Sequence, residues 1–98
     1  MASGIIHPMP FLLEDVVVAS TDTDTIAANS GANFTKSVAK TGYTAVGIVG
    51  IHKQGQNYAN VFLTQFFLDG QNAIVGAYNS NSSSRTISIV ATIMYVKA

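Results

Sequence analysis

This chain of 98 residues contains no cysteine, no tryptophan and only two prolines. Without cysteine it can form neither disulfides nor thiolate metal sites, so packing must stabilise it, within one chain or between several. Charged residues make up only 10% of the sequence, and five basic side chains balance five acidic ones. A chain without net charge has no positive field to attract phosphate groups, so we expect no nucleic-acid partner.

Long hydrophobic runs and helix-forming residues are also scarce. The longest unbroken apolar run, residues 45–51, is far shorter than the roughly 20 residues that span a bilayer, so we expect no membrane insertion. Val, Ile, Thr, Tyr and Phe together number 37, whereas the straight-chain helix formers number 17. This composition predicts a single domain, mostly of β-structure, because a chain this short cannot enclose two cores.

Alternating apolar residues and intervening turns predict seven short strands and no helix. Such a pattern is typical of an all-β fold, an antiparallel β-sandwich or jelly-roll-like barrel. Pro8 and Pro10 disfavour a helix before the first strand, so residues 1–13 are expected to be an extended lead-in or linker stub and residues 14–98 the domain. The predicted strands are residues 14–20, 25–28, 33–39, 43–52, 60–68, 72–78 and 85–97.

Two connections and one strand have distinctive sequences. Asp69 and Gly70 predict a tight hairpin with a type I′ turn, because this pair suits positive φ angles. The polar run 79–84 is expected to be the tip of a second hairpin. In the last strand, one face is predicted to consist of Ile87, Ile89, Ala91, Ile93 and Tyr95.

Apolar residues occupy both faces of several predicted strands, in residues 43–51, 60–68 and 90–96. A sandwich core covers only one face of each strand. We therefore expect the second faces to be buried between subunits of an obligate oligomer, since exposing them would favour aggregation.

Residues that could support catalysis or bind metal are few. A triad of His52, an aspartate and a serine is disfavoured, because no serine lies in a nucleophile-elbow sequence. Asp22 and Asp24 alternate as calcium ligands do, but the glycine and the distal glutamate of an EF-hand are missing, which favours a solvated turn. The sequence thus predicts no enzyme activity, no metal site and no cofactor.

The remaining candidate site is a set of polar loops. Residues 54–58 and 79–84 supply amides, hydroxyls and an aromatic ring, and the adjacent Arg85 adds a guanidinium, all of which are groups that bind sugars. We expect ligand contacts from Tyr58, Asn79, Asn81 and Arg85, and the alternative is that these loops are ordinary solvated tips. Whether the two loops lie at the same end of the sandwich stays open.

One stretch of the chain resembles a known group of proteins. Residues 41–50 read Thr-Gly-Tyr-Thr-Ala-Val-Gly-Ile-Val-Gly, and they are followed by a strand-turn-strand, a loop beginning at Asn79 and a terminal Tyr-Val-Lys at 95–97. Over residues 14–98 this pattern resembles the C-terminal head domains of phage fibre and tail-appendage proteins.

The resemblance implies a homotrimeric β-sandwich on a virion that binds a host-surface receptor, a glycan or a protein, without catalysis. A purely structural role, as a capsid decoration or a fibre-trimerising cap, is the main alternative. A polysaccharide-degrading enzyme is the least favoured one, because the chain has one glutamate and four aspartates.

Overall fold

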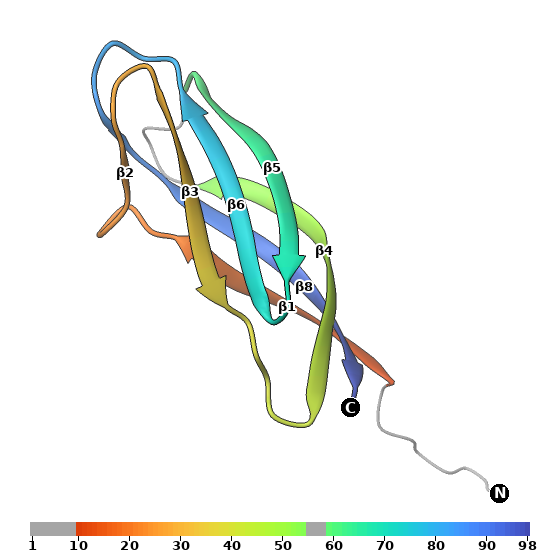
Figure 1. Cartoon of the computed structure of the whole chain (residues 1–98). Coiled ribbons are helices and arrows are strands. Elements are labelled where there is room, and N and C mark those ends of the chain that lie inside the picture. Colours follow the sequence, from red (N-terminus) through yellow and green to blue (C-terminus); the bar gives the residue numbers. More distant parts are fainter. Residues whose placement is uncertain (1–9, 55–58) are drawn as a thin grey trace, which may run out of the picture.

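The computed structural model describes residues 10–54 and 59–98, and this part of the chain contains eight strands and no helix (Figure 1). The strands are β1 (Phe11–Ala19), β2 (Thr25–Ile26), β3 (Ser30–Ser37), β4 (Tyr43–Gln54), β5 (Val61–Asp69), β6 (Asn72–Asn79), β7 (Arg85–Thr86) and β8 (Ser88–Lys97).

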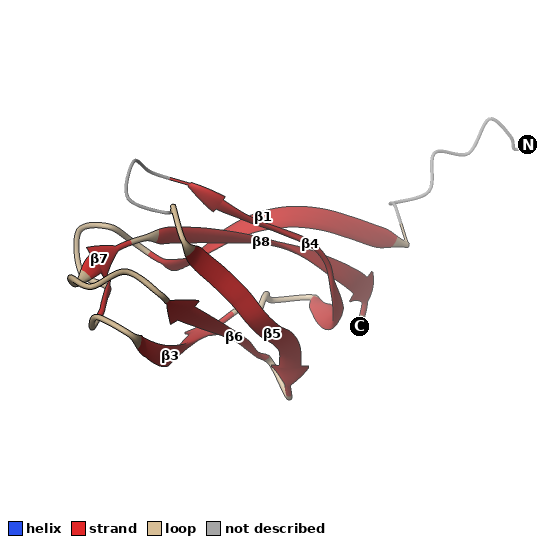
Figure 2. Ribbon diagram, turned by 90° about the horizontal axis from the view of Figure 1, so that it is seen from above, coloured by secondary structure: helices blue, strands red, loops and turns tan. Residues whose placement is uncertain are grey.

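The strands form two antiparallel three-stranded sheets and a short ribbon. One sheet has the order β1-β8-β4, the other has the order β3-β6-β5, and β2 pairs with β7. Figure 2 shows the two sheets as facing layers. The predicted all-β antiparallel sandwich is therefore confirmed.

Each predicted strand has a counterpart, but most boundaries shift by one to three residues, and two differences change the strand pairing. β1 begins at Phe11, so residues 11–13 pair with β8 and do not belong to the expected lead-in. The predicted last strand is divided at Ile87 into β7, which pairs with β2, and β8, which pairs with β1 and β4.

Of the two predicted hairpins, the first is present and the second is not. Asp69 pairs with Asn72, and φ is positive at Gly70 (61°) but not at Gln71, which is the pattern of a type II′ turn and not of the expected type I′ turn. The segment 80–84 connects β6 to β7 of the short ribbon, which continues into β8 of the opposite sheet, so the prediction that this segment is a hairpin tip is wrong. Both edges of β6 are already paired, with β3 and β5, and β8 therefore finds its partners in the opposite sheet.

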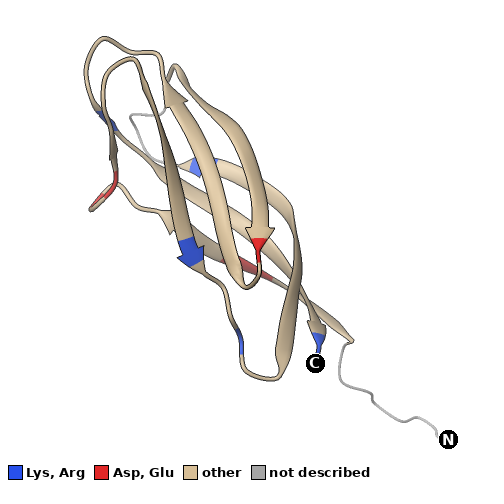
Figure 3. Ribbon diagram, viewed as in Figure 1, with Lys and Arg blue, Asp and Glu red and all other residues tan. Residues whose placement is uncertain are grey.

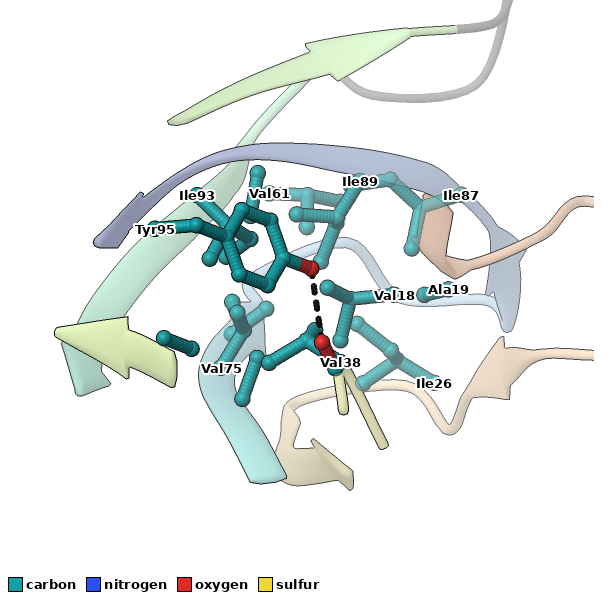
Figure 4. Close-up of a cluster of buried hydrophobic side chains, with 14 residues drawn as sticks. Val18, Ala19, Ile26, Val38, Val61, Val75, Ile87, Ile89, Ile93 and Tyr95 are labelled. Atoms are coloured by element: carbon teal, nitrogen blue, oxygen red, sulfur yellow. Dashed lines mark hydrogen bonds between the residues drawn. The ribbon is translucent and has the colours of Figure 1, made fainter. Parts of the chain in front are cut away.

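The core lies between the two sheets, and one face of β8 contributes four of its fourteen residues (Figure 4). The predicted inward face is confirmed, since its five residues are no more than 2% exposed. Tyr95 brings a hydroxyl into this core, and that hydroxyl donates a hydrogen bond of 2.6 Å to the carbonyl oxygen of Val38 (Figure 4). The aromatic ring thus fills the core without leaving a polar group unsatisfied. The five residues of the predicted inward face are Ile87, at the break before β8, and Ile89, Ala91, Ile93 and Tyr95 of β8.

Gln71, in the turn between β5 and β6, holds the two sheets together at this end of the sandwich. Its Oε1 accepts from the backbone N–H of Ala45 (2.8 Å) and its Nε2 donates to the Ala45 carbonyl (3.1 Å). Its own carbonyl accepts from the N–H of Val38 (2.9 Å). One side chain therefore satisfies both backbone groups of Ala45 in β4.

Candidate functional site

The connections that follow β2, β4 and β6 meet at one end of the sandwich, which we call the loop end (residues 27–29, 59–60 and 80–84; Figure 1). The N–H of Ser80 donates to the carbonyl of Asn60 (2.9 Å), and Asn81 Nδ2 donates to the carbonyl of Ala59 (2.8 Å). The N–H of Asn29 donates to the carbonyl of Asn81 (3.1 Å). Residues 59–60, which follow the predicted loop 54–58, thus lie beside the second predicted loop, 79–84.

Asn79 is the centre of this arrangement and is completely buried. Its Nδ2 lies at hydrogen-bonding distance from the carbonyl oxygens of Ile26 (3.0 Å), Ala27 (3.2 Å) and Ser83 (3.0 Å). Its Oδ1 accepts from the backbone N–H (2.9 Å) and the Nδ2 (2.8 Å) of Asn81. Asn79 has no exposed surface for a ligand, and this position corrects its predicted role.

Two other residues predicted to contact a ligand, Asn81 and Arg85, form hydrogen bonds within the loop end. Asn81 is half-buried and bridges Asn79 to the carbonyl of Ala59. Arg85 Nη1 donates to the carbonyl of Ser84 (3.2 Å) and also bonds Ser83 Oγ. Tyr58 lies outside the described residues.

Two asparagines flanking Asn81 have left-handed backbones. Asn29 has φ of 51° and Asn60 has φ of 57°. Asparagine adopts this conformation more readily than most residues. Asparagine at both positions therefore favours the two turns that contact Asn81.

The acidic turn after β1 forms local hydrogen bonds. Asp24 Oδ2 accepts from the N–H of Ser20 (2.8 Å) and from Thr23 Oγ1 (3.1 Å). His52 Nε2 lies 3.0 Å from Gln54 Nε2. No group of three or more His, Cys, Asp or Glu within residues 10–54 and 59–98 could hold a metal ion.

An open depression of about 390 Å³, which no sequence pattern indicates, lies at the opposite end. At its rim, Lys40 Nζ lies 2.9 Å from Glu14 Oε2, and the hydrogen bond to this carboxylate raises the pKa of Lys40. The neighbouring carboxylate compensates the ammonium, so this depression offers little net charge to an anion. Its lining residues are Ala39, Lys40, Thr41, Tyr43, Thr44 and Gln71.

The outer surfaces of both sheets carry large exposed apolar side chains. Leu13 of β1 is 56% exposed and Val49 of β4 is 55% exposed, while Phe62 of β5 is 53% exposed. Figure 3 shows few charged residues over either sheet. The described chain alone therefore leaves much of the second apolar faces uncovered. The exposed large apolar residues are Phe11, Leu13, Val17, Val46, Val49, Phe62, Phe66, Phe67 and Tyr78.

Comparison with protein-family models, with curated proteins and with solved structures gives no match to this chain. No helix able to cross a bilayer occurs in the described part of the chain.

Proposed function

We propose that this chain is a non-catalytic subunit of a homo-oligomeric virion appendage, similar to the head domains of phage fibres and tails. The exposed apolar surface on the outside of both sheets is the observation that carries this proposal. Soluble monomers rarely expose contiguous apolar patches of large size, and a surface poor in charge gives weak protection against association.

Side-chain neighbours across each sheet support a continuous apolar surface. Leu13 of β1 pairs with Met94 of β8, which in turn pairs with Gly47 of β4, so apolar residues lie side by side across all three strands. In the other sheet, Phe67 of β5 pairs with Ile74 of β6. Covering such surfaces with further copies contributes roughly 25 cal/mol for each Å² of apolar area buried.

The purified protein should therefore contain more than one copy at micromolar concentration, and the resemblance implies three. Phe67→Asp should yield a folded protein of lower mass, because the ring is exposed in the single chain but an unpaired carboxylate in an interface is strongly unfavourable. Light scattering measures the mass, and circular dichroism checks the fold.

Thr35→Asp is the matched control, because Thr35 is also exposed and lies on the other side of the same neighbour, Ile74. It places a carboxylate on the same sheet without removing an apolar group. A monomeric wild-type protein would overturn the proposal of self-association.

Receptor binding is the second part of the proposal, and the construction of the loop end supports it. The exposed serines Ser80, Ser82 and Ser84 lie on a backbone that the amide of buried Asn79 holds in place. Hydroxyls on a fixed backbone can bind a host-surface glycan or protein with little loss of conformational freedom.

Purified protein should accordingly label host cells, and Ser82→Arg with Ser84→Arg should reduce labelling several-fold by obstructing the loop end. Cell labelling measured by fluorescence tests this, with Thr35→Arg as a control for added charge. Correct assembly without any labelling would instead favour the purely structural role.

A further inference from the structure

The outer edge of β1 is an open hydrogen-bonding surface. Among the described residues, β1 pairs with β8 alone, so its other edge has no strand beside it. The carbonyl of Pro10 accepts from the N–H of Lys97 (3.1 Å), which places the backbone groups of even-numbered residues toward β8. Because these directions alternate along a strand, the odd-numbered residues between 11 and 17 direct their N–H and C=O groups to the open edge.

The other edge strands of the two sheets carry features that hinder pairing. β4 has two register shifts, between Ala45 and Gly47 and between Ile48 and Gly50, and Gln71 occupies both backbone groups of Ala45. β5 has one register shift, and the ammonium of Lys53 donates to the carbonyl of Val61, its first residue. β3 carries the exposed Lys36 near its end. Bulges and lysines of this kind protect edges from association.

β1 has no such protection over most of its length. Its single register shift lies between Val17 and Ala19, at the end of the strand. The one charged side chain on its outer face, Asp15, accepts a hydrogen bond of 2.6 Å from Thr92 Oγ1 of β8 and so leans away from the edge. Leu13 beside it is 56% exposed.

We propose that the open edge of β1 pairs antiparallel with β1 of a second copy of this chain. The proposal rests on the self-association proposed above and specifies one contact that produces it. Pairing joins two three-stranded sheets into one of six strands and makes their apolar outer faces continuous.

Like charges and strand irregularity disfavour three registers of this pairing. A two-fold axis at Asp15 would oppose two aspartates, and an axis at Glu14 would oppose two glutamates, which is destabilising. An axis at Val16 would require regular pairing through the irregular end of the strand. An axis at Leu13 avoids all three problems and sets Leu13 opposite its own copy and Phe11 opposite Asp15.

A single cysteine tests this register, because the chain contains none of its own. In the proposed pair, the two copies of residue 13 form a hydrogen-bonded pair with Cα atoms about 5.5 Å apart, within the range that a disulfide spans. The two copies of residue 15 lie about 14 Å apart along the strands, which is too far.

Under mild oxidation of the full chain, Leu13→Cys should give roughly ten-fold more disulfide-linked dimer than Asp15→Cys. Thr35→Cys, exposed on β3, measures random collision between copies. Non-reducing electrophoresis quantifies the dimer, and light scattering on the wild-type protein gives the number of copies.

A two-fold contact alone gives two copies, and combined with a three-fold contact it gives six. Either number together with selective linkage at residue 13 supports the proposal. Three copies without linkage at residue 13 would overturn the β1 pairing and leave the proposed function intact. Equal linkage at all three positions would also overturn the β1 pairing. A monomer without linkage would overturn both proposals and would favour an extended segment of another protein as the partner of the β1 edge.

Discussion

Asn79→Ala should lower the free energy of unfolding by about 3 kcal/mol or more, because each buried polar group left without a partner costs about 1–3 kcal/mol. The substitution removes the donor shared by three backbone carbonyls and the acceptor for the N–H of Asn81. For a domain of this size the loss corresponds to a fall in melting temperature of at least about 12 °C. Thermal unfolding followed by circular dichroism measures it.

Two further variants separate the amide from the mere loss of side-chain volume. Asn79→Asp keeps the size but directs a carboxylate at three carbonyl oxygens, so it should destabilise at least as much as alanine. Asn72→Ala, at the exposed first residue of the same strand, should change stability by less than about 0.5 kcal/mol. Equal effects at positions 72 and 79 would contradict a central role for the buried amide.

Asn79 was predicted to contact a ligand because of its polarity, although strand periodicity indicates that it is buried. The run Asn-Ser-Asn-Ser-Ser-Ser is so polar that its sequence predicts an exposed loop, with Asn79 available to a ligand. Ala73, Val75 and Ala77 of β6 face the core, however, and the two-residue period of a strand places Asn79 on that same face. Periodicity was therefore a better guide to the burial of Asn79 than its polarity.

The inward face of β8 was predictable from the sequence, whereas the strands that pair with β8 were not. Alternation along β8 is a local property of the chain, and it correctly identified the residues that line the core. The choice of partners, β1 and β4, depends on contacts with segments far away in the sequence. Adjacent polar and apolar runs therefore predicted a hairpin where the chain in fact crosses between sheets.

The stability of the protein should fall at alkaline pH because of Tyr95. Burial raises the pKa of this phenol, since the charged phenolate is poorly solvated in the core. The unfolded chain releases the proton near pH 10, whereas the folded chain holds it to higher pH. Above about pH 10 the unfolded state therefore binds fewer protons, and stability should decrease by up to about 1.4 kcal/mol per pH unit until the folded-state pKa is passed.

Lys40 contributes in the same direction, because its hydrogen bond to Glu14 raises the pKa of Lys40 and the stabilisation is lost once the ammonium deprotonates.

Denaturant unfolding between pH 7 and 12, at constant protein concentration, should separate the contributions of Tyr95 and Lys40. Lys40→Met should keep most of the alkaline decrease. Tyr95→Phe should cost about 1–3 kcal/mol at pH 7, because the Val38 carbonyl loses its donor, yet it should flatten the decrease above pH 10. An alkaline slope that persists unchanged in Tyr95→Phe would show that another group is responsible, since phenylalanine keeps the ring in the core and removes only the ionisable hydroxyl.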